Sequence, residues 1–209
     1  MDKNSLSVAG AAIVALITAL IGPIVVEYVK SKFNSNKKQD PIKSELEHSR
    51  VIDDELEEIR TLLKADRCWI SMFHNGGYYL HSSKSMKKFS IMFENSAPGV
   101  SGVSMLFNNL PVSLFSKFIE EIVKNKKIYI SDFNDPTVAT FCMKGSAEAS
   151  GTVSSYSVAL LDIATDQCIG ILGIDYLKKN KLNSSELSLL NEKVQRIAGF
   201  LSNFINDNR

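Results

Sequence analysis

The residues best suited to chemistry lie in the segment Phe73 to Tyr79, with the sequence FHNGGYY. His74 and Asn75 supply hydrogen-bond donors and acceptors, and Gly76 and Gly77 allow positive φ or a close approach of the backbone to a ligand. The same residues also fit a hairpin turn of the Asn-Gly type. Turn chemistry alone accounts for Asn75 and Gly76, which favours the turn over a binding loop.

Metal chemistry is disfavoured by the spacing of the remaining ligand types. His74 and His81 lie seven positions apart, and no third ligand or HExxH motif accompanies them. The cysteines Cys68, Cys142 and Cys168 are widely spaced and form no CxxC pair, so neither a disulfide framework nor a zinc ribbon is expected. Cys68 and Cys168 fall in apolar strand patterns typical of small buried residues, whereas Cys142 is the most open to another role. We expect no cofactor.

Enzyme signatures are also lacking. The sequence contains no GxSxG, GxxxxGK[ST], GxGxxG or protein-kinase motif set. Asp132 and Asp175 follow predicted strands, where capping a solvated turn is the ordinary role of aspartate. The formal net charge of +1 and the absence of a basic stripe disfavour nucleic-acid binding. We therefore expect a protein that is not an enzyme.

The amino-terminal region predicts a membrane anchor. Residues 6–26 carry no charge and are long enough, as a helix, to cross a hydrocarbon core of about 30 Å. A cleaved signal peptide fits less well, because the apolar run is long and only Lys3 precedes it. The lysines after the run are Lys30, Lys32, Lys37 and Lys38. The positive-inside rule therefore predicts a transmembrane helix within residues 1–30, a linker at 31–41, and a carboxy-terminal domain on the cytoplasmic side of an inner membrane.

Two helices with narrow apolar seams flank the central region. Residues 42–66 carry Ile52, Leu56, Ile59 and Leu63 at spacings of three and four, and residues 183–209 repeat this pattern. The acidic run 53–58 indicates a solvated face of the first helix. Asn183 with Glu186 predicts a capping box for the second. The seams could pack on a sheet, on each other, or on a second subunit.

The central region, 67–182, alternates between strand and helix signals. Strands are expected at Arg67–His74 and around Phe89–Glu94, an amphipathic helix at Pro111–Lys124, and a short strand at Lys127–Ser131. Val153–Tyr176 predicts a long antiparallel hairpin whose strands each have two distinguishable faces. The pattern predicts an α+β domain built on an antiparallel sheet.

In this order of elements the chain resembles a GAF domain. The segments that carry the resemblance are KIYISDFND at Lys127–Asp135, SSYSVALL at Ser154–Leu161 and CIGILGIDYL at Cys168–Leu177. The resemblance implies a GAF-like antiparallel sheet flanked by helices, here preceded by one transmembrane helix and a coiled-coil-like helix. A GAF sheet has six strands, and the sixth would lie within Tyr78–Lys84 or in the loop after Glu94. The combination also resembles small proteins of tailed-phage genomes.

The resemblance further implies a ligand pocket between the sheet and the helical loop 133–151. Its border would contain Phe89, Tyr129, Asp132, Phe141, Cys142 and Ser157. The chain departs from the family's known ligand motifs. Asp135 precedes Pro136, which breaks the cyclic-nucleotide pattern, and Cys142 precedes methionine where bilin-binding members usually have histidine.

Two functions follow as expectations. The first is a membrane-tethered sensory or interaction module without its own output domain, which acts through self-association, for example as a dimer, or through a protein partner. The alternative is a small-molecule-binding or enzymatic protein that uses the FHNGG segment and a pocket near Asp132, with an unknown ligand.

Overall fold

The computed structural model describes residues 41–80 and 83–207. The predicted membrane segment 6–26 and the linker up to residue 40 lie outside these residues. None of the described helices is long and apolar enough to cross a membrane. The chain divides into two compact units, residues 1–46 and 47–209, and the fold given below is that of the second unit.

Within the described residues, six strands form one antiparallel sheet in the order β3-β2-β1-β6-β5-β4. The strands are β1 Arg67–Tyr78, β2 Ser85–Ser96, β3 Leu110–Pro111, β4 Lys127–Ile130, β5 Ser154–Leu161 and β6 Cys168–Tyr176. The short sixth strand, β3, lies in the loop after Glu94, and this confirms one of the two predicted locations.

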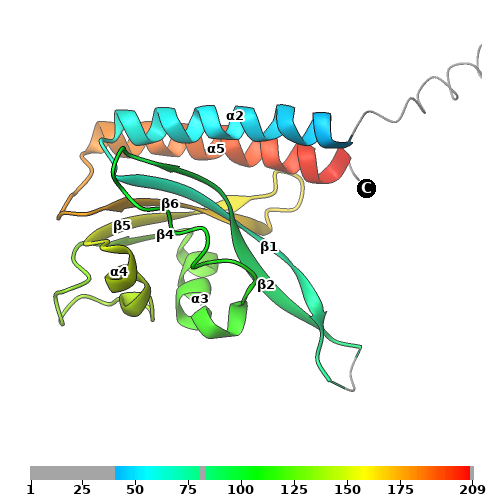
Figure 1. Ribbon diagram of the computed structural model, residues 1–209, viewed down its shortest axis with the longest axis horizontal. Coiled ribbons are helices and arrows are strands. Elements are labelled where there is room, and N and C mark those ends of the chain that lie inside the picture. Colours follow the sequence, from blue (N-terminus) through cyan, green and yellow to red (C-terminus); the bar gives the residue numbers. More distant parts are fainter. Residues whose placement is uncertain (1–40, 81–82, 208–209) are drawn as a thin grey trace, which may run out of the picture. The chain divides into compact units, whose positions relative to one another are not determined.

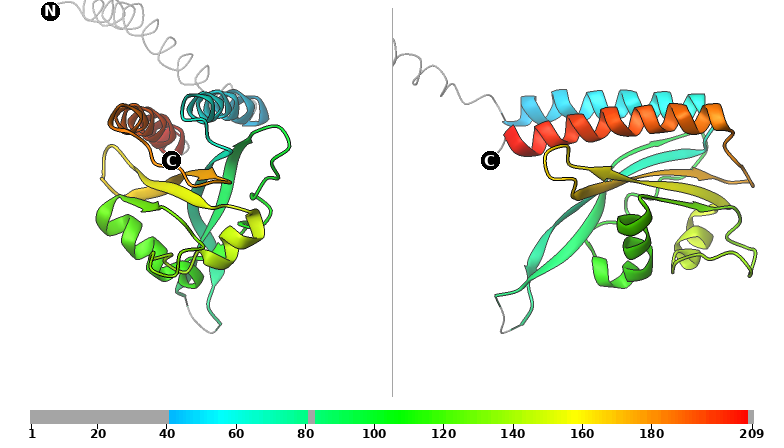
Figure 2. Two further views of the ribbon diagram at one scale, coloured as in Figure 1. Left: turned by 90° about the vertical axis from the view of Figure 1, so that its left-hand side faces the viewer. Right: turned by 180° about the vertical axis from the view of Figure 1, so that it is seen from behind.

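The helices are α2 Pro41–Leu62, η1 Val112–Phe115, α3 Ser116–Asn125, α4 Lys144–Ser150 and α5 Ser184–Asp207. In the second unit, α5 and the part of α2 after residue 46 lie side by side over one face of the sheet (Figure 1). The opposite face carries α3, α4 and their loops (Figure 2). The sheet is therefore the middle of three layers.

The apolar seams predicted for the two flanking helices are buried in this arrangement. Ile52, Leu56 and Ile59 of α2 and Leu190 and Ile197 of α5 are all buried in one cluster with residues of the sheet. The seams thus pack on the sheet and on each other, which confirms two of the three expected arrangements. The capping box is also confirmed, since Asn183 Oδ1 accepts the Glu186 N–H at 3.0 Å and Glu186 Oε2 accepts the Asn183 N–H at 2.8 Å.

The acidic run of α2 is only partly solvated. Glu55 is buried and lies between the helices, where its Oε2 is 3.1 Å from Lys193 Nζ and its Oε1 is 2.9 Å from Arg196 Nε. The prediction of a wholly solvated face was wrong at this position. A buried carboxylate requires charged partners, and α5 supplies them.

The two faces of each central strand are separated as predicted. Leu160, Leu172 and Ile174 enter the cluster under α2 and α5, whereas Ala159 and Ile171 enter the cluster under α3 and α4. The alternation in β2 is interrupted, however. Ile70 pairs with Phe93 and Ser71 pairs with Ile91, so Met92 forms a bulge. Phe93 consequently packs on the α2/α5 side, although the sequence places it on one face with Phe89 and Ile91.

Candidate functional site

A small cavity lies where a ligand pocket was expected, between the sheet and the helical loop that contains α4. Its interior volume is about 30 Å³. That is room for about two water molecules and far less than the several hundred Å³ of a typical small-molecule pocket. The polar side chains of its wall come from α4, β5, β6 and the segments between them: Ser146, Ser150, Thr152, Ser155, Ser157 and Asp175.

Trp69 of β1 is one of the apolar residues of the wall. It pairs across the sheet with Gly173 of β6, and its indole ring covers that glycine. The indole Nε1 donates a hydrogen bond of 3.0 Å to Asp175 Oδ2. The ring is therefore fixed both by shape and by a buried hydrogen bond.

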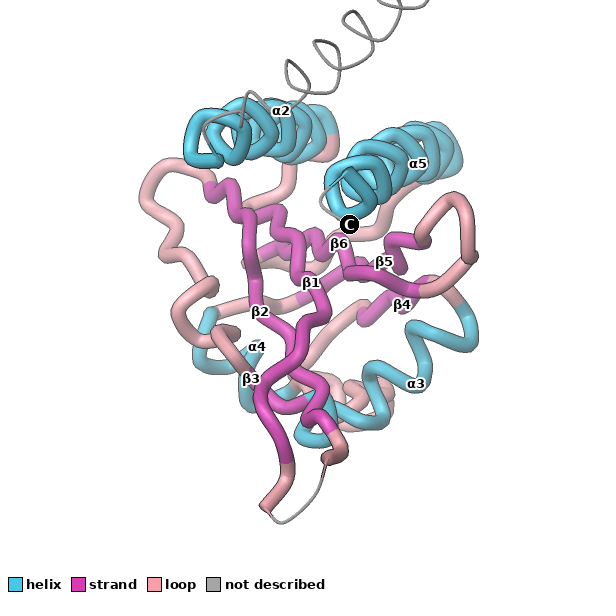
Figure 3. The backbone as a smooth tube through the Cα atoms, turned by 90° about the vertical axis from the view of Figure 1, so that its right-hand side faces the viewer, coloured by secondary structure: helices cyan, strands magenta, loops and turns pink. Residues whose placement is uncertain are grey.

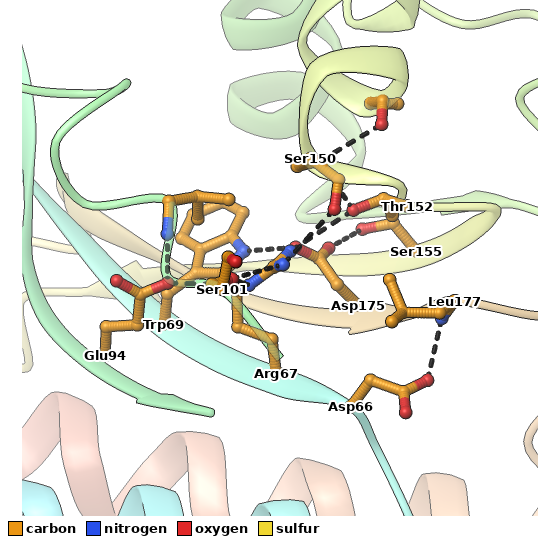
Figure 4. A network of polar contacts seen from close by, with 12 residues as sticks. Asp66, Arg67, Trp69, Glu94, Ser101, Ser150, Thr152, Ser155, Asp175 and Leu177 are labelled. Carbon is orange, nitrogen blue, oxygen red and sulfur yellow. Dashed lines mark hydrogen bonds and ion pairs between the residues drawn. The ribbon is translucent and has the colours of Figure 1, made fainter. Parts of the chain in front are cut away.

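Asp175 lies at the centre of a buried polar network (Figure 4). Its Oδ2 also accepts from Arg67 Nη1 at 3.2 Å, and its Oδ1 accepts from Ser155 Oγ at 2.9 Å. Burial raises the pKa of this carboxyl, while the donors Trp69, Ser155 and Arg67 act in the opposite direction. The predicted role of Asp175 as a solvated turn cap was wrong, because the sequence does not show that β1 and β5 flank it with donors.

Arg67 connects this network to the loops above the sheet. Its side chain is 1% exposed, and its Nη2 donates to the backbone oxygen of Ser101 at 2.7 Å. Nη1 donates to Thr152 Oγ1 at 3.3 Å, next to the carboxy-terminal end of α4. Its Nε lies 3.5 Å from Glu94 Oε1. One guanidinium thus joins the loop around residue 101, the segment after α4 and strand β6.

Glu94 of β2 binds the loop that contains Val103. Its two carboxylate oxygens accept the backbone N–H groups of Val103 at 2.6 Å and Ser104 at 2.9 Å. A charged acceptor for two adjacent N–H groups holds this loop tightly against the sheet. Since Val103 also lines the cavity, the loop forms part of its wall.

Of the residues predicted to border the pocket, Ser157 lines the cavity. Phe89 is buried in the neighbouring core, where its ring makes an edge contact with Phe115 at 5.4 Å. Phe141 is half-buried against the same core, and Cys142 beside it is exposed. The cavity is therefore narrower than the predicted border, because aromatic side chains fill the space around it.

Tyr129 and Asp132 lie away from the cavity, which corrects their predicted position. Tyr129 stacks on Tyr156 at 4.3 Å between ring centroids, on the α5 side of the sheet, since Ile128 and Ile130 take the other face. It lines a surface groove of about 370 Å³. Asp132 forms a turn with the Asn134 N–H at 2.9 Å and an ion pair with Lys179 at 2.7 Å. These contacts hold the pKa of Asp132 below its ordinary value and match its predicted turn-capping role.

The segment around His74 is neither a loop nor a turn. Strand β1 continues to Tyr78, with Asn75 paired to Lys87, and Gly77 adopts a φ of 88° at an irregularity in the pairing. The prediction of an Asn-Gly turn was therefore wrong. His74 Nε2 lies 3.0 Å from Ser90 Oγ, and Asn75 Oδ1 accepts from Lys87 Nζ at 2.6 Å.

This segment and Asp132 do not form one site. Strands β6 and β5 separate β1 from β4 in the sheet. Among residues 41–80 and 83–207, no group of three His, Cys, Asp or Glu side chains could hold a metal ion. The residues that sequence reasoning missed are Arg67, Trp69 and Glu94. The signal that could have found them is a charged or polar residue inside an otherwise apolar strand, as in RCWI and GIDY.

Comparison with known proteins identifies the family of this domain. The family model for the GAF domain matches residues 47–201. Comparison with curated protein sequences gives no match. Among solved structures, the GAF3 domain of Slr1393 from Synechocystis sp. PCC6803, in its photoproduct state, superposes with a TM-score of 0.60 at 16% identity, covering 78% of this chain and 98% of that chain.

Two further structures show the same fold. The phycoerythrobilin-bound GAF domain of a cyanobacterial phytochrome has a TM-score of 0.57 at 20% identity, with 77% of this chain and 88% of that chain covered. The GAF domain region of a Geobacter sulfurreducens PCA protein has a TM-score of 0.57 at 14% identity, with 78% of this chain and 98% of that chain covered. That protein is described as a membrane protein. At these identities the similarity establishes the fold and not the ligand.

Proposed function

Because the chain belongs to the GAF domain family over residues 47–201, we propose that it is a membrane-tethered GAF module that acts through contacts with a protein. The proposal includes no catalytic role. The observation that carries it is the small cavity, about 30 Å³, whose lining residues Trp69 and Asp175 are joined by a buried hydrogen bond.

The contrast with a chromophore-binding relative supports this choice. That GAF domain is described as bound to phycoerythrobilin, a tetrapyrrole far larger than two water molecules. To admit a ligand of that size, this chain would have to displace the Trp69 ring and break the buried contacts of Asp175. Leaving buried charges without partners costs several kcal/mol, on the order of 3–5. A large ligand would have to supply that free energy in addition to its own binding.

The packing of α2 and α5 limits the surfaces through which two copies of the chain could associate. Since the apolar seams of α2 and α5 are buried within one chain, a second subunit cannot use them unless the domain opens. The exposed face of α2 carries Asp53, Asp54 and Glu57, and two such faces repel each other, whereas Glu58 forms an ion pair with Lys193 of α5. These features favour a partner protein with a basic surface, and self-association stays the second form of the proposal.

The ligand question is tested with the single tryptophan of the chain. In the full chain in detergent micelles, Trp69 fluorescence is titrated with a bilin and with a cyclic nucleotide. We expect neither a saturable change nor a rise in thermal stability, whereas a true ligand at 100 times its dissociation constant would add about 2.7 kcal/mol. Free N-acetyltryptophanamide, titrated with the same compounds, gives the non-specific background. A saturable change in Trp69 emission that exceeds this background would contradict the proposal.

The tethering and its orientation are tested with Cys142. This thiol is exposed, Cys68 is buried, and burial raises the pKa of the half-buried Cys168 thiol, which makes it less reactive. Spheroplasts that express the full chain are treated with a membrane-impermeant maleimide. We expect the chain to resist carbonate extraction and Cys142 to react only after permeabilisation, with Cys142→Ser as the control. Labelling of intact spheroplasts, or extraction by carbonate, would refute this part of the proposal.

A further inference from the structure

The β1–β2 hairpin extends beyond the rest of the sheet (Figures 1 and 3). Its outer part exposes three large side chains in a row: Tyr78 at 72%, Tyr79 at 45% and Leu80 at 85%. Such a run is unusual on a water-exposed surface, because each side chain forgoes the free energy of burial. The Asn75–Lys87 and Tyr78–Ser85 pairs show that the strand pairing continues this far.

The same hairpin is positively charged. It carries Lys84, Lys87 and Lys88, and the sequence contains no carboxylate between Asp66 and Glu94. The acceptor of the Lys87 ammonium is the neutral amide oxygen of Asn75, which does not cancel its charge. The stem of Lys88 crosses directly over Gly76, where a Cβ would lie 2.2 Å from Lys88 Cδ. An apolar stem on the strand with a charged end is the arrangement by which lysine covers a surface and keeps its ammonium solvated.

From these two observations we propose that the hairpin binds the surface of an anionic membrane. Tyr78, Tyr79 and Leu80 enter the headgroup region, and the lysines lie against anionic lipid headgroups. Tyrosine is enriched at membrane interfaces because its ring is apolar and its hydroxyl is polar, and each nearby lysine adds about fivefold to the affinity for an anionic surface. The inference rests on the proposed tethering only in that tethering brings the domain close to a bilayer.

Lipid fits these residues better than nucleic acid does. The most exposed side chain of the three is Leu80, which offers no ring for base stacking. The cations in the outer part of the hairpin are lysines and not arginines, so this part lacks the side chain that makes bidentate contacts with phosphate or bases. An aliphatic tip beside lysines is complementary to headgroups over acyl chains.

The test places an environment-sensitive fluorophore at residue 80 of the full chain. The Leu80→Cys variant, in a Cys142→Ser background, is labelled and reconstituted into nanodiscs of phosphatidylcholine with or without phosphatidylglycerol. The matched control is Met105→Cys, since Met105 is 93% exposed and lies outside the hairpin. We expect a blue-shifted emission and quenching by spin-labelled lipid at residue 80 in the anionic nanodiscs. The fluorophore at residue 105 should remain in water in both kinds of nanodisc.

A second set of variants tests the charges. Replacing the three hairpin lysines by glutamine should lower the ratio of bound to free hairpin about 100-fold, at about fivefold per lysine, whereas replacement by arginine should preserve it. Trp69 fluorescence reports whether each variant is folded.

The inference is overturned if residue 80 stays as aqueous as residue 105 in anionic nanodiscs while the chain remains in the nanodisc fraction. It is also overturned if residue 80 responds to single-stranded RNA and not to lipid. Loss of the chain from the nanodisc fraction would instead refute the tethering, so the two failures are distinguishable.

Discussion

The indole ring of Trp69 lies so close over Gly173 that a Cβ on residue 173 would be 2.1 Å from ring atoms Cε2 and Cζ2. The two residues are a cross-strand pair between β1 and β6. Trp69 occupies its position because its partner has no side chain, and Asp175 then fixes the ring through a hydrogen bond. Since Trp69 lines the cavity, this pair fixes one part of the cavity wall.

Gly173→Ala should therefore lower the free energy of unfolding by about 1–3 kcal/mol, because overpacking forces a rigid aromatic ring to move. Urea denaturation measures the loss, and Trp69 fluorescence reports the displacement. Gly145→Ala is the matched control, since a Cβ there meets no atom within 4 Å and alanine favours the helix α4. If the two variants have equal stability, the ring is not fixed by Gly173.

Asp175→Asn should destabilise the domain by about 3–5 kcal/mol, because Arg67 is left buried without its nearest carboxylate. In addition, the NH2 group of asparagine is a donor and would face one of the donors that now bind the carboxylate. Ser155→Ala removes one neutral donor from the same carboxylate and should cost only about 1 kcal/mol. Urea denaturation compares the two variants. A loss for Asp175→Asn no larger than that for Ser155→Ala would show that the ion pair is not important for folding.

Lys193→Met should lower the free energy of unfolding by about 1–3 kcal/mol, because Glu55 loses one of its two cationic partners. The loss should be smaller than for a buried carboxylate with a single partner, since Arg196 still contacts Glu55. The double variant with Glu55→Met should recover most of the loss, since it removes both buried charges and the two partners that remain, Glu58 and Arg196, are at least half exposed to water. Glu57→Gln, on the exposed side of α2, should change stability little. Thermal unfolding of the full chain measures all three. Failure of the double variant to recover would indicate that the pair is not coupled.

Asp132 should make stability depend on pH in the acid range. The hydrogen bond from Lys179 and the Asn134 N–H hold its folded-state pKa below the unfolded value of about 3.9. The folded state therefore binds fewer protons, so this contribution is complete above that value and is lost as the pH falls through the lower, folded-state pKa. The stability difference between wild type and Asp132→Asn should shrink over this window in urea titrations. A difference independent of pH would argue against the contact.

Much of the fold follows from local patterns. The seam of Ile52, Leu56 and Ile59 predicts a buried helix face because residues three and four apart share one side of a helix. The Asn183 cap depends only on residues three positions away, so it can be identified without the fold. The alternation in Val153–Tyr176 likewise predicts two strand faces, and both clusters confirm it.

The candidate site depended on contacts that no local pattern contains. Trp69 and Asp175 are far apart in the sequence, and only the register between β1 and β6 brings them together. The bulge at Met92 moves Phe93 to the other face of the sheet, which the simple alternation of β2 does not predict. Tyr129 was assigned to the pocket by resemblance, and the pleat of β4 turns it toward α5 instead.

The sequence by itself therefore determined most of the elements and most of their apolar faces, because periodicity and capping act over a few residues. The tertiary structure alone decided that Arg67, Trp69 and Asp175 meet and leave a cavity of about 30 Å³. Strand register and side-chain packing join residues about a hundred positions apart. A one-residue change in that register would place each of these side chains on the opposite face of the sheet.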